Sequence, residues 1–360
     1  MLVSQPSATD PKRKVNKPLL TWKEVIGPAE PFLDAVAGRL SEQIKAFERD
    51  IATYAEYALT NQGKQIRPVL VALAGGATGR ISEPHITAAV IIEMVHLATL
   101  VHDDVMDEAQ IRRGRPTLAA NWGSEISVLL GDCLFAHAVE LAAGFPSTEV
   151  CRAVSAATKA VCSGEILQTQ RRKNFELSRA EYFQVIQMKT GELFALSCDL
   201  GAYLSGAGAG QRSALRQYGL AIGTAYQIYD DCLDLFGSET AAGKSLGTDL
   251  TKGKLTLPLL LALEQAGPED RAALQAMVSD WAPEHFPRMH TLLDRYGALD
   301  GARQALQQYL QLAHQALDVV PESECRASLD TLSSYLARQT NALGGGTPAT
   351  NSGRPMGGTI

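Results

Sequence analysis

Apolar side chains recur three and four residues apart along almost the whole chain between residues 23 and 342. In the first such segment, Phe32, Val36 and Leu40 share one face of a helix. Similar runs rich in Ala, Leu and Ile follow at 86–107, 124–143, 149–170, 178–204, 211–236 and 255–266, and residues 286–343 fit two or three further helices. The sequence has no alternating β-pattern of useful length. We therefore expect an all-α fold, a single large helical bundle around one core.

The two ends of the chain differ from this pattern. Residues 1–22 are largely polar and contain proline, and residues 343–360 are rich in Gly, Thr and Pro without an apolar period. Both ends are expected to be disordered. The folded domain is accordingly expected to span residues 23–342, because no change of composition within it marks a second domain.

Charge and hydropathy disfavour two classes of partner. The chain has 39 acidic and 33 basic residues, a net charge of -6, and so has no general preference for nucleic acid. The most apolar stretch, 86–101, is interrupted by Glu93 and His96, so no membrane span is expected. A secretory signal pattern is missing, and the six cysteines are scattered without a CxxC pair, which favours a reducing, cytoplasmic setting.

The first chemical signal is a run of aspartates near the end of the 86–107 segment. On a helix, Asp103, Asp104 and Asp107 fall within one narrow sector. Three carboxylates on one face repel each other, and a divalent cation relieves that repulsion. Hard oxygen ligands suit Mg²⁺, which also takes water and phosphate oxygens. This motif alone fits either a metal site or a solvated acidic patch at a helix end.

The same spacing recurs near the end of the 211–236 segment. Asp230, Asp231 and Asp234 follow another apolar helical run, and Gln227 lies one turn earlier on the same face. If the two helices face each other, six carboxylates line one cavity. We expect Mg²⁺ ions there, holding a diphosphate.

Basic residues accompany both aspartate motifs. Arg offers a planar fork to phosphate oxygens, and Lys offers a point charge. The candidates are Arg112, Arg113 and Arg115 after the first motif, Lys244, Lys252 and Lys254 after the second, Lys64 and Arg67 in an early glycine-bearing segment, and Lys189 beside Thr190. Any one of them alone fits an ordinary surface charge. His96 shares a helix with Asp103, but its residue type and position alone favour a core histidine.

At this point the sequence resembles the trans-isoprenyl (polyprenyl) diphosphate synthases over residues 30–340. The resemblance rests on segments in the family's order: GKQIRP (63–68), HLATLVHDDVMDEAQIRRGRPT (96–117), GEILQ (164–168) with KTGEL (189–193), YQIYDDCLD (226–234) and GKSLGTDLTKGKLTLP (243–258). Tyr226 stands where Phe is common, and Gln62 where the family often has Gly. The resemblance implies the isoprenoid synthase fold, usually a homodimer, around a deep central cavity.

The resemblance also implies roles for individual residues. Asp103, Asp107 and Asp230 would bind Mg²⁺, with Asp104, Asp231 and Asp234 completing the catalytic motifs. The allylic diphosphate would contact Arg112, Lys189, Thr190, Gln227, Lys244 and Lys254. Isopentenyl diphosphate would contact Lys64, Arg67, His96 and Arg113, which makes His96 a substrate-binding residue.

The expected activity is a Mg²⁺-dependent head-to-tail condensation of isopentenyl diphosphate with an allylic diphosphate. In this family, bulky residues four and five positions before the first aspartate give short products. Here these positions are Thr99 and Ala98, with Val95 deeper, so the resemblance implies an all-trans long-chain product such as octaprenyl diphosphate. On an ideal helical wheel, however, Ala98 lies nearly opposite the aspartates. The alternatives are a geranylgeranyl or farnesyl diphosphate synthase and, more remotely, a non-catalytic subunit of a heteromeric prenyl synthase.

Overall fold

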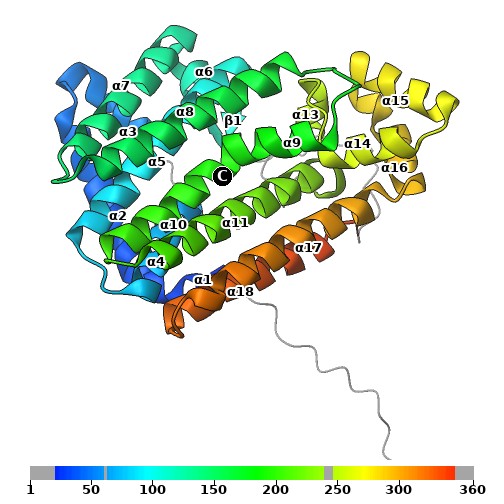
Figure 1. Cartoon of the computed structure of the whole chain (residues 1–360). Helices are drawn as coiled ribbons and strands as arrows, with labels where there is room; N and C mark the ends of the chain where they lie inside the picture. Colours follow the sequence, from blue (N-terminus) through cyan, green and yellow to red (C-terminus); the bar gives the residue numbers. More distant parts are fainter. Residues whose placement is uncertain (1–20, 61–62, 239–245, 345–360) are drawn as a thin grey trace, which may run out of the picture.

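The computed structural model describes residues 21–60, 63–238 and 246–344, and these parts of the chain are almost entirely helical (Figure 1). The N-terminal part forms α1 (Trp22–Ile26), η1 (Gly27–Ala29), α2 (Glu30–Gln43), η2 (Ile44–Ala46), α3 (Arg49–Thr60) and α4 (Ile66–Thr78). The central part forms α5 (Glu83–Met106), α6 (Leu118–Trp122), α7 (Ser124–Ala143), α8 (Thr148–Gln170), α9 (Arg179–Ile186), the π-helical turn η3 (Gln187–Gly191), α10 (Glu192–Leu204) and α11 (Ala209–Phe236). The C-terminal part forms α13 (Thr248–Thr251), α14 (Leu257–Gln265), α15 (Pro268–Ser279), η4 (Pro283–His285), α16 (Phe286–Arg295), α17 (Ala298–Ala316), η5 (Leu317–Val319) and α18 (Glu324–Asn341).

The all-α prediction is confirmed, with differences in detail. The first apolar segment, over residues 31–60, was predicted as one helical stripe but forms two α-helices, because the chain becomes extended at Phe47. Helix α4 was not predicted, since it is buried on nearly all sides and has no polar face to reveal its period. The described strands are β1 (Ile111–Arg112) and β2 (Arg115–Pro116), which form a two-residue antiparallel hairpin with Ile111 opposite Pro116.

The folded part reaches slightly further at both ends than the predicted 23–342. Helix α1 begins at Trp22, and the Thr21 hydroxyl caps it in a reciprocal pair with Glu24. At the other end Leu343 is buried, and the Gly344 backbone N–H donates to the Phe236 carbonyl over 3.3 Å. Residues 1–20 and 345–360, which carried the disorder prediction, lie outside the described residues.

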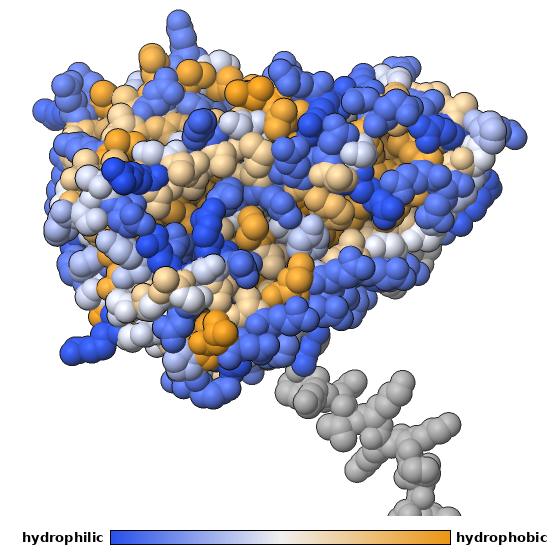
Figure 2. Space-filling view, in the orientation of Figure 1, coloured by the Kyte–Doolittle hydropathy of each residue, from blue (hydrophilic) through white to orange (hydrophobic). Residues whose placement is uncertain are grey.

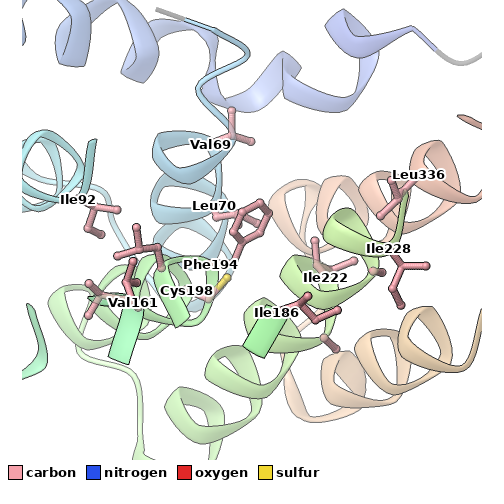
Figure 3. Close-up of a cluster of buried hydrophobic side chains, with 14 of the residues drawn as sticks. Val69, Leu70, Ile92, Val161, Ile186, Phe194, Cys198, Ile222, Ile228 and Leu336 are labelled. Carbon is pink, nitrogen blue, oxygen red and sulfur yellow. The ribbon is translucent and has the colours of Figure 1, made fainter. Parts of the chain in front are cut away.

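The centre of the bundle is built from α4, α5, α10 and α11, and Figure 1 shows α10, α11 and α17 running side by side. Helices α10 and α11 cross closely because Gly219 lacks a side chain: a Cβ there would lie 2.4 Å from the Phe194 carbonyl oxygen. Figure 3 shows Phe194 and Cys198 of α10 next to Leu70 of α4 and Ile222 of α11. This continuous core holds the two long helices that carry the aspartate motifs.

Helix α5 is fixed at its start and carries its motif at its end. Ser82 and His85 form a reciprocal cap, Pro84 occupies the first turn, and the His85 ring contacts the Gly201 carbonyl over 3.1 Å. Beyond a long buried stretch, Asp103 and Asp104 lie in the last turn, and Asp107 is the C-cap residue. Helix α11 likewise ends just after Asp234, so each motif lies at the end of a rigid element.

Two helices, α5 and α7, are long and apolar enough to cross a membrane by length and hydropathy alone. The sequence prediction had set aside the α5 stretch because of Glu93 and His96, and had not considered α7. In the most apolar window of α5, 67% of the residues are buried inside the protein, against 33% in α7. A largely buried apolar helix that carries two aspartates in its last turn is typical of a core helix.

Candidate functional site

A cavity of about 1430 Å³ lies between the ends of α5 and α11. Four of the six motif carboxylates line it, namely Asp103, Asp107, Asp230 and Asp231. The expectation that all six face one space is therefore wrong for Asp104 and Asp234, both of which are buried away from the cavity. The three residues predicted to bind metal, Asp103, Asp107 and Asp230, are all among the four.

The first motif is surrounded by cations from other parts of the chain. The Asp103 carboxylate lies 3.6 Å from the Lys189 ammonium, and Asp107 accepts a hydrogen bond from Lys254 over 2.9 Å. Burial raises the pKa of Asp103, although Lys189 opposes this. Asp104 points the other way and accepts from Arg112 Nε over 2.7 Å. Asp104 thus holds Arg112 in place and does not itself face the ligand space.

The second motif divides in a similar way. Asp231 accepts hydrogen bonds from Tyr182 Oη over 2.6 Å and from Gln227 Nε2 over 2.8 Å. Asp234 accepts from the Thr248 hydroxyl over 2.7 Å and from the Asp249 backbone N–H over 3.1 Å, and so anchors the following loop. Asp230 remains at the cavity wall. Burial lowers the pKa of Lys64, and the negative charge of Asp230 partly offsets this effect.

The donor set at the cavity fits divalent metal ions bridged by a ligand. Within residues 21–60, 63–238 and 246–344, no three His, Cys, Asp or Glu side chains converge as a ready-made metal site. The cavity does offer hard carboxylate oxygens on two walls, with lysines next to Asp103 and Asp107 where a cation would sit. Such carboxylates suit an ion whose remaining ligands are water and phosphate oxygens.

The four residues predicted to bind isopentenyl diphosphate all line this cavity, namely Lys64, Arg67, His96 and Arg113. The Arg67 guanidinium lies over the Phe194 ring at 5.1 Å, and its buried Nε has no hydrogen-bond partner among the described residues. Arg113 adopts a left-handed conformation in the hairpin turn, with φ of 51°. A buried donor with no protein acceptor is suited to an anionic ligand.

His96 is expected to be neutral near pH 7. Burial, together with the charges of Arg67, Arg113 and Arg112, holds its pKa well below the usual value of 6.5. The unfolded chain therefore takes up the proton first, and His96 costs stability as the pH falls below about 6.5. Histidine NMR spectra, with His96→Gln for assignment, should show this ring neutral at pH 7, with a titration midpoint well below 6.5. A titration midpoint at or above 6.5 would contradict this geometry.

Five of the six residues predicted to contact the allylic diphosphate line the cavity, namely Arg112, Lys189, Thr190, Gln227 and Lys254. Two of these side chains are linked: the Thr190 hydroxyl donates to Gln227 Oε1 over 2.7 Å. Lys189 and Thr190 come from the π-helical turn η3, and Arg112 comes from β1. The sixth residue, Lys244, lies outside the described residues.

Of the three residues predicted to set chain length, one lines the cavity and two do not. Thr99 lines the cavity one turn below Asp103. Ala98 and Val95 are buried in the core and are not among the cavity-lining residues of the described chain. This agrees with the ideal helical wheel, which turns Ala98 away from the aspartates. Their proposed effect on product length stays a prediction.

Sequence reasoning missed several polar residues of this cavity. Tyr182 donates to Asp231, and the charges of Arg67 and Arg113 act on the buried Glu93 carboxyl group. Arg172, which is not a lining residue, lies 3.3 Å from Asp107. Glu165 and Gln168 both contact Lys189. The last two lie in the GEILQ segment, which was part of the resemblance but had been given no role.

Comparisons with known proteins agree with this geometry. The family described as polyprenyl synthetase matches residues 48–292, which include both aspartate motifs. The chain is 33% identical to the octaprenyl diphosphate synthase of Haemophilus influenzae, over 90% of this chain and 98% of that protein. It is also 33% identical to an all-trans-nonaprenyl-diphosphate synthase of Rhodobacter capsulatus, over 86% and 95% of the two chains.

Solved structures share the fold over most of the chain. The polyprenyl synthase of Caulobacter crescentus, solved with calcium and isoprenyl diphosphate, superposes with a TM-score of 0.84 and is 33% identical. The superposition covers 90% of this chain and 99% of that one. That structure therefore holds a divalent cation together with a prenyl diphosphate on a closely similar fold.

Proposed function

This chain belongs to the polyprenyl synthetase family, and we propose that it uses Mg²⁺ to condense isopentenyl diphosphate head-to-tail with an allylic diphosphate. The proposed product is an all-trans long-chain polyprenyl diphosphate, such as octaprenyl diphosphate. The observation that carries this proposal is one cavity with Asp103 and Asp107 on one wall, Asp230 on another, and basic residues around both. The names of the octaprenyl and nonaprenyl relatives support the long-chain product.

The polar residues suit a reaction in which an allylic carbon–oxygen bond breaks. Mg²⁺ bound at Asp103, Asp107 and Asp230 would neutralise the diphosphate as negative charge develops on its departing oxygen. Lys189 and Lys254 are close enough to these carboxylates to contact the same diphosphate. Their charges are fixed before the reaction begins, so little reorganisation is needed as the bond breaks.

The second substrate would be held at the other end of the cavity. Lys64, Arg67 and Arg113 supply cations for its diphosphate, and neutral His96 supplies a ring N–H. This arrangement would hold the double bond of isopentenyl diphosphate next to the allylic carbocation, which it attacks. A proton then leaves the new chain, and the departed diphosphate is the proposed base. The apolar walls, with Val161, Leu193 and Phe194 among them, exclude water that would quench the cation.

We also propose that the enzyme is a cytoplasmic homodimer. Large hydrophobic side chains are exposed on α7 and α8: Val128, Leu129 and Val139 on the first, and Ile166, 58% exposed, on the second. Figure 2 shows hydrophobic atoms along the upper edge of the molecule, where Figure 1 places these helices. Exposed apolar side chains of this size on neighbouring helices are typical of a protein–protein interface. Light scattering of the purified protein would measure the oligomeric state.

Incorporation of labelled isopentenyl diphosphate tests the proposed activity. The purified chain, supplied with an allylic diphosphate and Mg²⁺, is expected to form labelled product without a second protein, and chelation of the metal should abolish this. If product forms only after a different prenyl synthase subunit is added, the chain is the non-catalytic subunit of a heteromer. That outcome would overturn the proposal.

Thr99→Phe is expected to shorten the product. Thr99 lines the cavity on α5, and its hydroxyl donates to the His96 carbonyl over 2.7 Å, so a larger side chain here narrows the space below the aspartates. Chromatography of the dephosphorylated products should show a shift to fewer isoprene units, while Thr99→Ser should retain the product of the unmodified enzyme. An unchanged product from a folded, active Thr99→Phe variant would place the limiting wall elsewhere.

A further inference from the structure

Lys189 is held at the cavity wall by acceptors from two different helices. Its ammonium forms an ion pair with Glu165 of α8, donates to Gln168 Oε1 over 3.0 Å, and lies 3.6 Å from Asp103 Oδ2 of α5. Gln168 is therefore the hydrogen-bond acceptor of this ammonium, whereas Glu165 and Asp103 are its ion-pair partners. The side chain is 21% exposed, and the contacts therefore form at the edge of the cavity, where little water competes.

The backbone at this point is built to bring Glu165 and Lys189 together. Lys189 lies in the π-helical turn η3, and Gly164 of α8 packs directly against that turn. A Cβ at Gly164 would lie 2.8 Å from the Lys189 nitrogen, so any larger residue would push the helices apart. Glu165 and Gln168 lie one helical turn apart on the same side of α8, and both line the cavity.

Lys189 and a metal ion would compete for the same Asp103 carboxylate. Lysine is a cation near neutral pH, and the Lys189 ammonium contacts both Asp103 and Glu165. A lysine paired with Asp103 alone would have to be displaced before a cation could bind there. A second carboxylate, Glu165, pairs with the same ammonium and reduces this competition.

We propose that Glu165, assisted by Gln168, is a positioning residue that holds Lys189 off Asp103, so that Asp103 can bind the metal and Lys189 the diphosphate. This inference rests on the proposed function of the cavity. It assigns a role to Glu165 and Gln168 of the GEILQ segment, which the two aspartate motifs leave without one. In Glu165→Gln, Asp103 becomes the nearest carboxylate partner of Lys189, and binding of the metal diphosphate should weaken although Asp103 itself is intact.

Calorimetric titration with magnesium pyrophosphate tests this without relying on turnover. Residues that support a metal ligand affect metal affinity by about 10- to 100-fold, and we expect Glu165→Gln to weaken binding by an amount in that range. Glu125→Gln, at an exposed position of α7, is the matched control and should bind like the unmodified protein. Gln168→Met, which keeps the side-chain volume, should also weaken binding, but by less. This variant provides the test if Glu165→Gln does not fold.

A double-mutant cycle with Lys189→Met separates positioning from direct binding. If Glu165 acts through Lys189, the Glu165→Gln change should alter binding by less than about twofold in the Lys189→Met background. An undiminished effect in that background, or unmodified affinity of folded Glu165→Gln and Gln168→Met, would overturn the inference. Failure of the unmodified protein to bind magnesium pyrophosphate would instead overturn the proposed function.

Discussion

Asp103→Asn should lower kcat by about 10²- to 10³-fold, the size of effect seen when one preorganised electrostatic contact to a transition state is removed. The amide keeps the shape of the side chain but loses the charge that would hold Mg²⁺ against the allylic diphosphate. Steady-state kinetics at saturating substrates would measure the loss. The fold should survive, because burial raises the pKa of Asp103 and its ionised form therefore costs stability in the folded protein.

The matched control for this variant is Asp34→Asn, on the exposed face of α2. It makes the same chemical change far from the cavity and should leave kcat and the melting temperature unchanged. An Asp103→Asn variant with near-normal turnover in Mg²⁺ would contradict the role of the first motif. A variant that loses its cooperative melt would show instead that Asp103 is needed for folding.

Asp230→Asn is expected to have an effect of similar size from the opposite wall. Asp230 lines the cavity at the end of α11, beside Lys64, and its charge partly offsets the burial that lowers the pKa of Lys64. Its loss should lower kcat by about 10²-fold or more and also raise KM for isopentenyl diphosphate, because Lys64 then loses a nearby counter-charge. Kinetics with each substrate varied in turn would separate these two effects.

Asp294→Asn, at an exposed position of α16, is the control for this second change. Equal loss of activity in Asp230→Asn and Asp294→Asn would indicate a general defect of the preparation. Normal turnover in Asp230→Asn would mean that the second motif does not bind the metal. The first motif would then have to act alone, contrary to the proposal that both walls hold one diphosphate.

Helical periodicity was sufficient to predict α5 and α11 and to place both aspartate motifs at their ends. It could not predict α4, whose faces are nearly all buried, or the hairpin that carries Arg112 and Arg113. Nor could spacing alone show that Asp104 turns to Arg112 and that Asp234 anchors the following loop. Those contacts join residues from separate elements, and a single-helix argument contains no information about them.

The same limit explains why the sequence did not predict the contact of Glu165 with Lys189 or settle which way Ala98 faces. Glu165 contacts Lys189 only because Gly164 allows α8 to approach the π-helical turn, and tertiary packing of that kind is not visible in a local pattern. For Ala98 the resemblance and the helical wheel disagreed. The residue is buried and does not line the cavity in the described chain, while Thr99 next to it does.

The central claim is that this cavity builds a long prenyl chain with Mg²⁺, and analysis of the reaction product tests it most directly. The purified enzyme would be incubated with farnesyl or geranylgeranyl diphosphate, labelled isopentenyl diphosphate and Mg²⁺, and the dephosphorylated products separated by reversed-phase chromatography. The proposed function predicts a Mg²⁺-dependent product longer than geranylgeranyl, in the range of octaprenyl. A farnesyl starter extended only to geranylgeranyl would contradict the long-chain assignment. No product with any allylic substrate would contradict the proposed prenyltransferase activity.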